Sequence, residues 1–353
     1  MIKQAYAFQT ENEPLMAAKY GSGHINTTYL VVDHQARQYI LQKINSHVFK
    51  KPDELMQNIK AVTDHLQSKV HNPRSALSLI PTMDGAAWHV DEDGETWRMY
   101  PFIVNSLCMQ KAQTPQIFKE SGIGFGTFQN QLSDFPAHNL YETIPHFHDT
   151  PKRYERFKTV LADDPVNRAG GVAAEIEFAL GLETYAQTLM NLLHRGDLPL
   201  RVTHNDTKLN NVLLDYDTHQ ALCVIDLDTV MPGLSVNDFG DSIRFGANTA
   251  AEDETDLSKV NFSLELFKAY ADGFLHACGE RLTDAERAHL CDGAKMMTLE
   301  CGLRFLTDYL EGDVYFKTHR PHHNLDRCKN QFALVKCMDK QWKHMQDIIQ
   351  KGL

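Results

Sequence analysis

Hydrophobic and polar residues alternate with a period of two over short stretches near the amino terminus, and this alternation predicts half-buried strands. Turn-forming residues separate the stretches. A single apolar stripe at helical spacing predicts one helix among them, at 52–67. Residues 1–102 are therefore predicted to form a small β-rich lobe, with strands at 29–32, 38–44, 77–82, 86–90 and 96–100.

Helical spacing dominates from about residue 114 onward. Three glycines, at 122, 124 and 126, resemble a phosphate loop, but they lie inside a helical pattern and are interpreted as sites of close helix packing. The capping box at 283–286 predicts the start of a helix of roughly 25 residues. The predicted fold class is α+β with two lobes, 1–102 and 103–353, joined by an extended hinge at 99–105. Further helices are predicted at 115–132, 175–194 and 327–351.

Polar residues at fixed spacing lie in the loop before a predicted hairpin at 212–225. His204, Asp206 and Asn211 form the pattern H-x-D-x-x-x-x-N, and the apolar run 221–225 ends in Asp226. In protein kinases the Asp of this loop accepts the proton of the substrate hydroxyl, while the Asn and the strand-end Asp hold Mg²⁺. Carboxylate and amide oxygens are hard ligands that suit this ion. The pattern predicts phosphoryl transfer from ATP, with Asp206 as base and Asn211 and Asp226 as Mg²⁺ ligands.

Three more polar residues near this loop require interpretation. Lys208 lies two residues past Asp206 and is predicted to reach the γ-phosphate as a point charge. The sequence D-F-G at 238–240 spells the metal-binding tripeptide of protein kinases, but a predicted turn at 231–233 separates it from the apolar run. We therefore predict a structural role for Asp238. For Asp228 a second metal ligand and a loop-stabilising residue remain equally open.

A Gly/Ser/Thr-rich stretch at 21–28 precedes the first predicted strand. Such a stretch brings backbone N–H groups close to phosphate because glycine has no side chain, although a plain hairpin turn is the alternative. Where protein kinases carry a strand lysine this chain has Gln42, so either a neutral donor contacts the nucleotide or the cation comes from elsewhere. Hinge backbone groups are expected to pair with adenine. The candidate nucleotide contacts are Gly21, Ser22, Gly23, Asn26, Thr27, Gln42, Pro101 and Ile103.

Composition and net charge indicate which kinds of binding partner and which cellular location to expect. The net charge of −11 over 353 residues disfavours nucleic acid and anionic membranes as partners. The 7 cysteines form no C-x-x-C pair, as expected for reduced thiols in a cytosol, and no long apolar run predicts a membrane span. We expect a cytoplasmic monomer that acts on small molecules. The histidines at 319, 322 and 323 lack a completing Cys or acidic ligand and are interpreted as part of a loop.

Four motifs, VTHNDTKLNNVLLD, VIDLDTVMPGLSVNDFGDSIRFGANT, GSGHINTTYLV and TLECGLRFLTDYLEGDVYFK, resemble the aminoglycoside-phosphotransferase-like superfamily of small-molecule kinases. Within that superfamily they are most similar to the N-acetylhexosamine 1-kinases. The resemblance implies ATP- and Mg²⁺-dependent phosphorylation of the anomeric hydroxyl of N-acetylglucosamine and N-acetylgalactosamine. By the same resemblance, the candidate sugar contacts are His24, Arg304, Tyr315, Asp241 and Arg244.

Several alternatives stay open. Arg304 lies one helical turn from Glu300, so an ion pair between them is an alternative to sugar binding, and Tyr315 has core packing as its alternative. The substrate of a related kinase could be another sugar, an aminoglycoside or an amino alcohol, although Arg304 and Arg244 disfavour a polycation. An inactive kinase-fold binding module predicts loss of the base or of a metal ligand, yet Asp206 and both predicted ligands are present.

Overall fold

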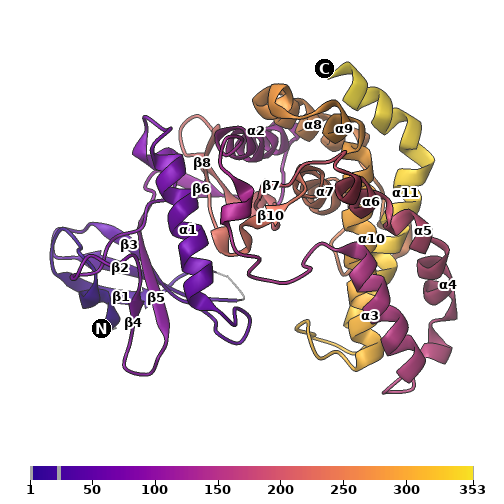
Figure 1. The fold of residues 1–353 in the computed structure, drawn as a ribbon, viewed down its shortest axis with the longest axis horizontal. Coiled ribbons are helices and arrows are strands. Elements are labelled where there is room, and N and C mark those ends of the chain that lie inside the picture. Colours follow the sequence, from indigo (N-terminus) through magenta and orange to yellow (C-terminus); the bar gives the residue numbers. More distant parts are fainter. Residues whose placement is uncertain (1–2, 22–24, 353) are drawn as a thin grey trace.

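The computed structural model describes residues 3–21 and 25–352 and has a small β-rich lobe at one end of a larger helical lobe (Figure 1). The predicted α+β, two-lobed fold class is confirmed. The small lobe is built on a five-stranded antiparallel sheet of order β1-β2-β3-β5-β4. Its strands are β1 (Pro14–Lys19), β2 (Thr27–Asp33), β3 (Gln38–Lys43), β4 (His89–Val90) and β5 (Thr96–Pro101).

Three of the five predicted small-lobe strands form as expected, and the predicted pair at 77–82 and 86–90 is mostly wrong. Ile80 donates one backbone hydrogen bond to Met99, but Pro81 has no N–H with which to continue a ladder. The hydroxyl of Thr82 then accepts from the backbone N–H of Ala86, which closes a turn. Only β4 remains of that pair. Strand β1, which sequence reasoning missed, is a largely exposed edge strand.

The helix α1 (Pro52–Gln67) connects the two lobes through their packing. It forms over the predicted range, and its apolar stripe of Leu55, Ile59, Val62 and Leu66 is buried. The same apolar cluster includes Ile44 from the small lobe together with residues of the large lobe, among them Phe128, Val202, Cys223 and Leu227. The side-chain amide of Asn58 on α1 also donates to the carbonyls of Tyr141 and Val230. The division at 102/103 stays a prediction, because the sheet ends at Pro101 while α1 shares its core with the large lobe.

The large lobe is mainly helical and is threaded by two small sheets, β6-β8-β9 and β10-β7. Its strands are β6 (Ser106–Cys108), β7 (Arg201–Thr203), β8 (Val212–Asp215), β9 (Ala221–Val224) and β10 (Met231–Gly233). Its helices are α2 (Pro115–Gln131), α3 (Thr150–Asp163), α4 (Ala173–Gly181), α5 (Glu183–Ala186), α6 (Thr188–Arg195), α7 (Ser235–Gly246), α8 (Leu264–Cys278), α9 (Asp284–Ala288), α10 (Leu290–Glu311) and α11 (His323–Lys351).

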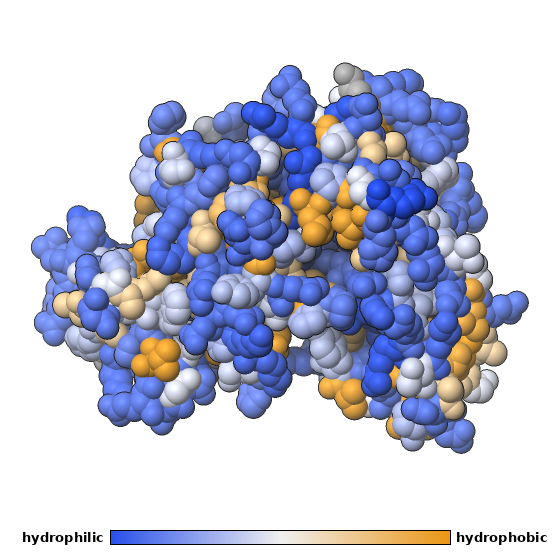
Figure 2. All heavy atoms as spheres, viewed as in Figure 1, coloured by the Kyte–Doolittle hydropathy of each residue, from blue (hydrophilic) through white to orange (hydrophobic). Residues whose placement is uncertain are grey.

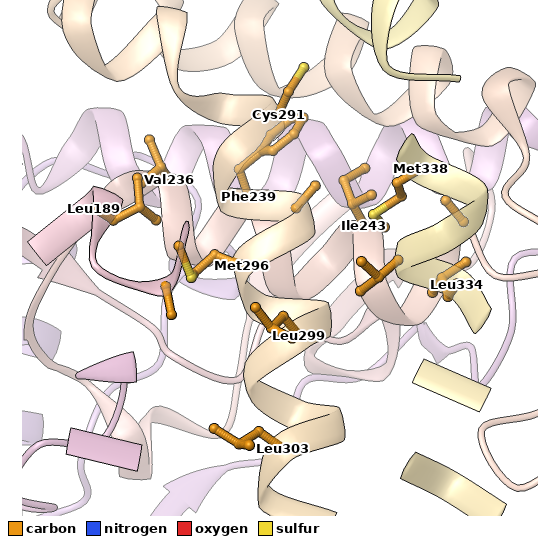
Figure 3. Packing of buried hydrophobic residues seen from close by; sticks show 14 of the residues in the cluster. Leu189, Val236, Phe239, Ile243, Cys291, Met296, Leu299, Leu303, Leu334 and Met338 are labelled. Atoms are coloured by element: carbon orange, nitrogen blue, oxygen red, sulfur yellow. The ribbon is translucent and has the colours of Figure 1, made fainter. Parts of the chain in front are cut away.

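Helix α10 runs through the core of this lobe. Figure 3 shows its apolar side chains meeting those of α6, α7 and α11. The labelled residues of this cluster are Leu189, Val236, Phe239, Ile243, Cys291, Met296, Leu299, Leu303, Leu334 and Met338. Across residues 3–21 and 25–352, no helix is both long enough and apolar enough to cross a membrane.

The glycines of α2 pack as predicted. A Cβ at Gly122 would lie 2.4 Å from the carbonyl oxygen of Tyr270, and one at Gly126 would lie 2.8 Å from that of Phe274. Both contacts are to the backbone of α8, which cannot yield as a flexible side chain would. The helical interpretation of these glycines is confirmed.

Two predicted helices are interrupted. The single helix expected at 175–194 is divided into α4, α5 and α6, because the hydroxyl of Tyr154 donates to the carbonyl of Ala179 and Leu182 then turns out of helical geometry. The capping box of Thr283 and Glu286 forms as predicted, but α9 ends after Ala288 and α10 starts separately. The last helix begins at His323 rather than at 327.

A predicted turn at 231–233 is also wrong, because these residues form β10 and pair with β7. The backbones approach closely there: a Cβ at Gly233 would lie 2.2 Å from the hydroxyl oxygen of Thr203. Residues Leu227–Thr229 form a 3₁₀ turn between β9 and β10. The helix α7 then starts at Ser235, so Asp238 lies in its first turn and not at a strand end.

Candidate active site

The buried carboxylate of Asp238, in the first turn of α7, holds the loop that follows β7. Asp238 accepts the backbone N–H of His204 at 2.8 Å, that of Asn205 at 2.8 Å and the side-chain amide of Gln129 at 2.7 Å. Burial raises the pKa of Asp238, while His204 and these hydrogen bonds oppose the rise. These contacts fit the structural role predicted for Asp238.

His204 is fully buried and connects the loop to the end of β9. Its Nε2 lies 2.9 Å from the carbonyl oxygen of Ile225, and its ring packs edge-on against Phe125 and Phe128. The backbone N–H of Ile225 donates in turn to the carbonyl of Asn211. Asp206 and Asp226 are thus held at fixed positions by the residues beside them.

Asp206, Lys208 and Asn211 lie together, as their spacing predicts. Oδ1 of Asp206 is 2.7 Å from Nζ of Lys208, and its Oδ2 accepts from the side-chain amide of Asn211 at 3.2 Å. The same amide donates to the backbone carbonyl of Asp206 at 2.8 Å. The Asp206 side chain is 30% exposed, so an incoming hydroxyl can reach it.

Asp226 occupies the left-handed backbone region, with φ 62° and ψ 60°. A non-glycine residue there costs roughly 1–3 kcal/mol and needs support from its surroundings. Solvent reaches the side chain, yet the surrounding protein partly desolvates it. This desolvation, followed by the negative charges of Asp228 and Asp206, raises the pKa of Asp226 to about 7, against the opposing charges of Arg98 and Lys208.

The predicted metal ligands fit a divalent cation. The amide nitrogen of Asn211 is used by the loop, whereas its amide oxygen and the carboxylate of Asp226 have no hydrogen-bond partner among residues 3–21 and 25–352. A carboxylate and an amide oxygen without hydrogen-bond partners are hard ligands that suit Mg²⁺. Asp228 is different, because both of its oxygens face partners from the small lobe, Asn26 and Arg98.

Most predicted nucleotide residues lie on the small-lobe side of this site. Gly21 has φ +77°, Thr27 begins β2, and Asn26 contacts Asp228. Ser22 and Gly23, like the predicted sugar contact His24, lie outside the described residues. Pro101 ends β5, and the backbone N–H of Ile103 has no partner within the described part of the chain. Gln42 is engaged by its neighbours: it accepts from Arg98 at 2.9 Å and donates to Thr28 at 3.0 Å. A nucleotide contact by Gln42 stays a prediction.

Arg304 has an aromatic environment. Its guanidinium carbon lies 5.3 Å from the ring centre of Phe147, 5.5 Å from that of Phe316 and 6.0 Å from that of Tyr315. No carboxylate pairs with it among the described residues. Glu300, the alternative partner, instead accepts from Thr150 at 2.6 Å and lies 2.8 Å from His148 Nδ1.

Tyr315 is 65% exposed, so the alternative of core packing is wrong for this residue. The buried carboxylate of Asp308 accepts the successive backbone N–H groups of Val314, Tyr315 and Phe316 at 2.9, 2.7 and 3.0 Å. This carboxylate fixes the loop that carries the tyrosine. The ring of Tyr315 stands edge-on to that of Phe316, with centroids 4.8 Å apart.

Asp241 and Arg244, the other two predicted sugar contacts, are buried and paired with each other at 3.0 Å. Asp241 also accepts the backbone N–H of Thr207, and Arg244 reaches Glu252 at 2.8 Å. Both side chains are thus occupied by ion pairs and by a bond to the backbone of the catalytic loop. Their contact with a substrate stays a prediction.

The interpretation of the histidines at 319, 322 and 323 as part of a loop is wrong for His323, which is the first residue of α11. His323 lies 3.1 Å from Asp253, His319 donates its backbone N–H to the His323 ring, and His322 meets the hydroxyl of Tyr309 at 3.0 Å.

Sequence reasoning missed Arg98, His148, Phe147 and Asp308. Arg98 did leave a signal, since it is a cation in the middle of the strand T-W-R-M-Y-P, of which only the last residue is exposed. His148 and Phe147 lie in a loop and Asp308 lies inside α10, where hydrophobic periodicity gives no information about contacts with residues distant in sequence.

A small sheet over a helical lobe, with a carboxylate loop and a strand-end aspartate at their junction, defines the protein-kinase-like class of phosphotransferases. The chain belongs to the phosphotransferase enzyme family, whose model matches residues 17–271.

Solved structures share the fold over nearly the whole chain. A microcompartment-associated aminopropanol kinase is 17% identical with a TM-score of 0.64, and the match covers 98% of this chain and 99% of that chain. The amicoumacin kinase hAmiN, in complex with AMP-PNP, Ca²⁺ and Ami, is 13% identical with a TM-score of 0.61, covering 98% and 92%. A choline kinase from Cryptosporidium parvum Iowa II is 13% identical with a TM-score of 0.58, covering 94% and 91%.

Proposed function

We propose that this protein is a kinase that transfers the γ-phosphoryl group of ATP to a hydroxyl of a small molecule, with a divalent cation as cofactor. One observation carries the proposal. Asp206 is held by Asn211 and Lys208 yet remains accessible. The loop that carries Asp206 and Asn211 is also bonded through His204 to Ile225, the residue before Asp226, so the unpaired oxygens of Asn211 and Asp226 are positioned by the same loop. An accessible base beside an oxygen donor set is what phosphoryl transfer to a hydroxyl needs.

Each residue then has a definite role. Asp206 orients the acceptor hydroxyl and takes its proton, while Asn211 keeps that carboxylate in place. Asn211 and Asp226 hold the cation, which supplies charge neutralisation at the phosphates when bound. Lys208 is close enough to Asp206 to contribute positive charge where the γ-phosphoryl group leaves ATP. Backbone groups at Gly21 and Ile103 face the nucleotide.

The acceptor we propose is an N-acetylhexosamine, phosphorylated at its anomeric hydroxyl. Arg304 supports this choice, because it has no carboxylate partner in the described part of the chain. Such a guanidinium repels an amino substrate but donates hydrogen bonds to hydroxyl and acetamido oxygens. Tyr315 and Phe316 add aromatic surface beside it, against which the apolar face of a sugar ring can pack. A nearby acidic candidate, Asp241, already carries Arg244 as its counter-ion.

The choice of hydroxyl rests on acidity. An anomeric hydroxyl is more acidic than the other hydroxyls of a sugar, so a carboxylate of modest basicity such as Asp206 is an adequate base for it. A site that hydrogen-bonds an acetamido group is left with unpaired polar groups when glucose binds, at a cost of about 1–3 kcal/mol for each group.

A panel of acceptors tests the proposal. ADP release is measured with ATP and Mg²⁺ for N-acetylglucosamine, N-acetylgalactosamine, glucose, choline, ethanolamine and an aminoglycoside, and ³¹P NMR locates the phosphate. We expect sugar 1-phosphates and a higher kcat/KM for the N-acetyl sugars. A 6-phosphate product, equal use of glucose, or a preference for the amines would refute the sugar assignment. No ADP release with any hydroxyl acceptor would refute the kinase proposal itself.

A further inference from the structure

Arg98 is a fully enclosed cation at the junction of the two lobes. It lies in β5 with a side-chain exposure of 1%, opposite Gln42 of β3. Its Nε donates to the side-chain oxygen of Gln42 at 2.9 Å, and Gln42 is held in turn by the hydroxyl of Thr28. A buried guanidinium is costly unless a counter-ion compensates it.

The counter-ion of Arg98 comes from the other lobe. Nη1 of Arg98 is ion-paired with Oδ1 of Asp228, whose side chain is 6% exposed and lies in the 3₁₀ turn Leu227–Thr229. The other oxygen, Oδ2, accepts from the side-chain amide of Asn26. The amide oxygen of Asn26 is itself fixed by the backbone N–H of Asn45 at 2.9 Å. Both oxygens of one large-lobe carboxylate are therefore held by small-lobe residues.

This arrangement supports the strained residue beside it. Asp226, with its left-handed backbone, lies directly before the turn that contains Asp228. On its amino-terminal side the chain is fixed by His204 and Asn211, which bond both backbone groups of Ile225. On its carboxyl-terminal side the tie to the small lobe is Asp228. The next anchored residue on that side is Thr229, which is bonded to His204 and Asn205, so releasing Asp228 would weaken the support of Asp226 at the turn that directly follows it.

We infer that Arg98 is a positioning residue of the phosphotransfer site: it clamps Asp228 to the small-lobe sheet and thereby fixes Asp226 in the orientation that its role as cation ligand requires. The clamp also joins Asn26, which is predicted to contact the nucleotide, to the segment that carries Asp226. The inference rests on the proposed function for the role of Asp226, whereas the clamp itself is a property of the ligand-free chain.

No other described cation on the central strands fits this place. Lys43, the neighbour of Gln42 in β3, pairs with Glu95 at 2.8 Å on the opposite face of the sheet. An arginine also suits the geometry better than a lysine, because its planar fork binds Gln42 and Asp228 simultaneously. Arg98 thus gives the small lobe the inward-facing cation that the glutamine at position 42 does not supply.

Amide hydrogen exchange of the ligand-free protein tests the clamp. The variants are Arg98→Gln, Asp228→Asn, the double variant, and Arg201→Gln as a matched control. Arg201, which is 19% exposed, forms an ion pair with the buried Glu286 at 2.7 Å, between β7 and α9. We expect exchange at 225–230 and 25–28 to be about tenfold faster or more in both single variants at the clamp, because local opening there becomes easier. Arg201→Gln should leave those segments unchanged.

Nucleotide binding tests the consequence. Isothermal titration gives the ratio of the ADP dissociation constants without and with Mg²⁺, and this ratio should fall about tenfold in Arg98→Gln, because fewer molecules hold Asp226 in its binding orientation. The double variant should be no worse than either single one, because the pair acts as a unit. Arg98→Lys, which keeps the charge but not the fork, should lie between the wild type and Arg98→Gln.

Outcomes that would overturn the inference are distinct from failure of the proposed function. Unchanged exchange at 225–230 in Arg98→Gln and Asp228→Asn, or strictly additive effects in the double variant, would show that the clamp does not exist.

An unchanged Mg²⁺ ratio together with a lowered Tm, the result expected for Arg201→Gln, would show that Arg98 stabilises the fold without positioning Asp226. A wild-type protein that binds no nucleotide would refute the proposed function, while the exchange data would still decide whether the clamp exists. If Arg98→Gln fails to fold, the exchange and the Mg²⁺ ratio of Asp228→Asn and Arg98→Lys decide whether the clamp exists and whether it positions Asp226.

Discussion

Nζ of Lys208 lies 2.7 Å from Oδ1 of Asp206, the carboxylate proposed as the base. Burial alone would lower the pKa of Lys208, but attraction to Asp206 and then to Asp241 raises it overall, so the lysine is charged at any physiological pH. The ion pair holds a cation beside the point where negative charge develops during transfer.

Replacing Lys208 by Met should lower kcat by about 10²–10³-fold, the usual cost of removing one group that stabilises transition-state charge. Steady-state kinetics at saturating ATP and acceptor measure the effect. Lys268→Met is the control, because Lys268 is an exposed residue of α8 that pairs with Asp272 of the same helix. A Lys208→Met enzyme with at least a tenth of the wild-type kcat would show that the lysine merely holds Asp206.

Asp206→Asn should reduce kcat by about 10²–10⁴-fold, because an amide cannot take the proton of the acceptor hydroxyl. The change keeps the size of the side chain and one acceptor oxygen, so the Kd of ATP, measured by titration calorimetry, should change little. Substantial turnover by this variant would mean that another group, or solvent, removes the proton.

Two aspartates near the site should respond differently to removal. Asp226→Ala should raise the Mg²⁺ concentration required for half-maximal activity or abolish activity, because a hard ligand is lost. Asp238→Ala should lower Tm, since the buried N–H groups of His204 and Asn205 lose their acceptor at about 1–3 kcal/mol each. Mg²⁺ titrations and thermal melts of both variants are compared. A Mg²⁺ requirement that moves with Asp238 and not with Asp226 would reverse the assignment.

The raised pKa of Asp226 predicts a pH dependence of stability. The pKa is about 7 in the folded chain, whereas the ordinary pKa of an aspartate is 3.8, so between those values the folded state binds the proton that the unfolded state releases. The contribution of this group to folding therefore falls as pH rises from about 4 to 7 and is fully unfavourable above that range. In EDTA, Asp226→Asn should raise Tm relative to wild type at pH 8.5 and show little difference at pH 4.

Melting curves of wild type and Asp226→Asn at several pH values in that range provide the test. Asp217→Asn serves as the control, because Asp217 lies in the exposed turn of the β8–β9 hairpin. A Tm difference between wild type and Asp226→Asn that is independent of pH would mean that Asp226 titrates normally.

Arg304→Met should raise KM for the acceptor by about tenfold or more while leaving KM for ATP nearly unchanged, because a donor to the acceptor oxygens is lost. The methionine keeps apolar contact with Phe147 and Phe316. Arg156→Met is the control, since Arg156 is an exposed arginine of α3 paired with Glu311. An equal rise in both KM values would place Arg304 in a general structural role.

The catalytic loop could be predicted from the sequence because its chemistry is local. Asp206 and Asn211 are five positions apart in one loop. Asp226 can be located because it directly follows an apolar run that predicts a strand. The structure places all three as their spacing requires. The fold class followed from period-two patterns early in the chain and helical patterns later.

The supports of the site could not be predicted, since each depends on partners distant in sequence. The pair of Arg98 and Asp228 joins β5 to a turn in the other lobe, and Glu300 is compensated by His148 rather than by Arg304, its neighbour on the same helix. Asn324 lies in the first turn of α11, where its amide donates to Asp308 and Asp313. Tertiary hydrogen bonds outweighed its low helix propensity.

The outer surface gives little hint of how the lobes are joined. Figure 2 shows mostly hydrophilic residues on the viewed face, which is hollowed between the small lobe on the left and the helical lobe on the right. Inside the molecule, α1 contributes Leu55, Ile59 and Val62 to a single apolar cluster that also contains Val202 and Leu227. Separating α1 from the large lobe would expose that cluster to water. The small sheet should therefore not melt ahead of the rest, and heating should produce one cooperative transition in which both lobes lose their structure together.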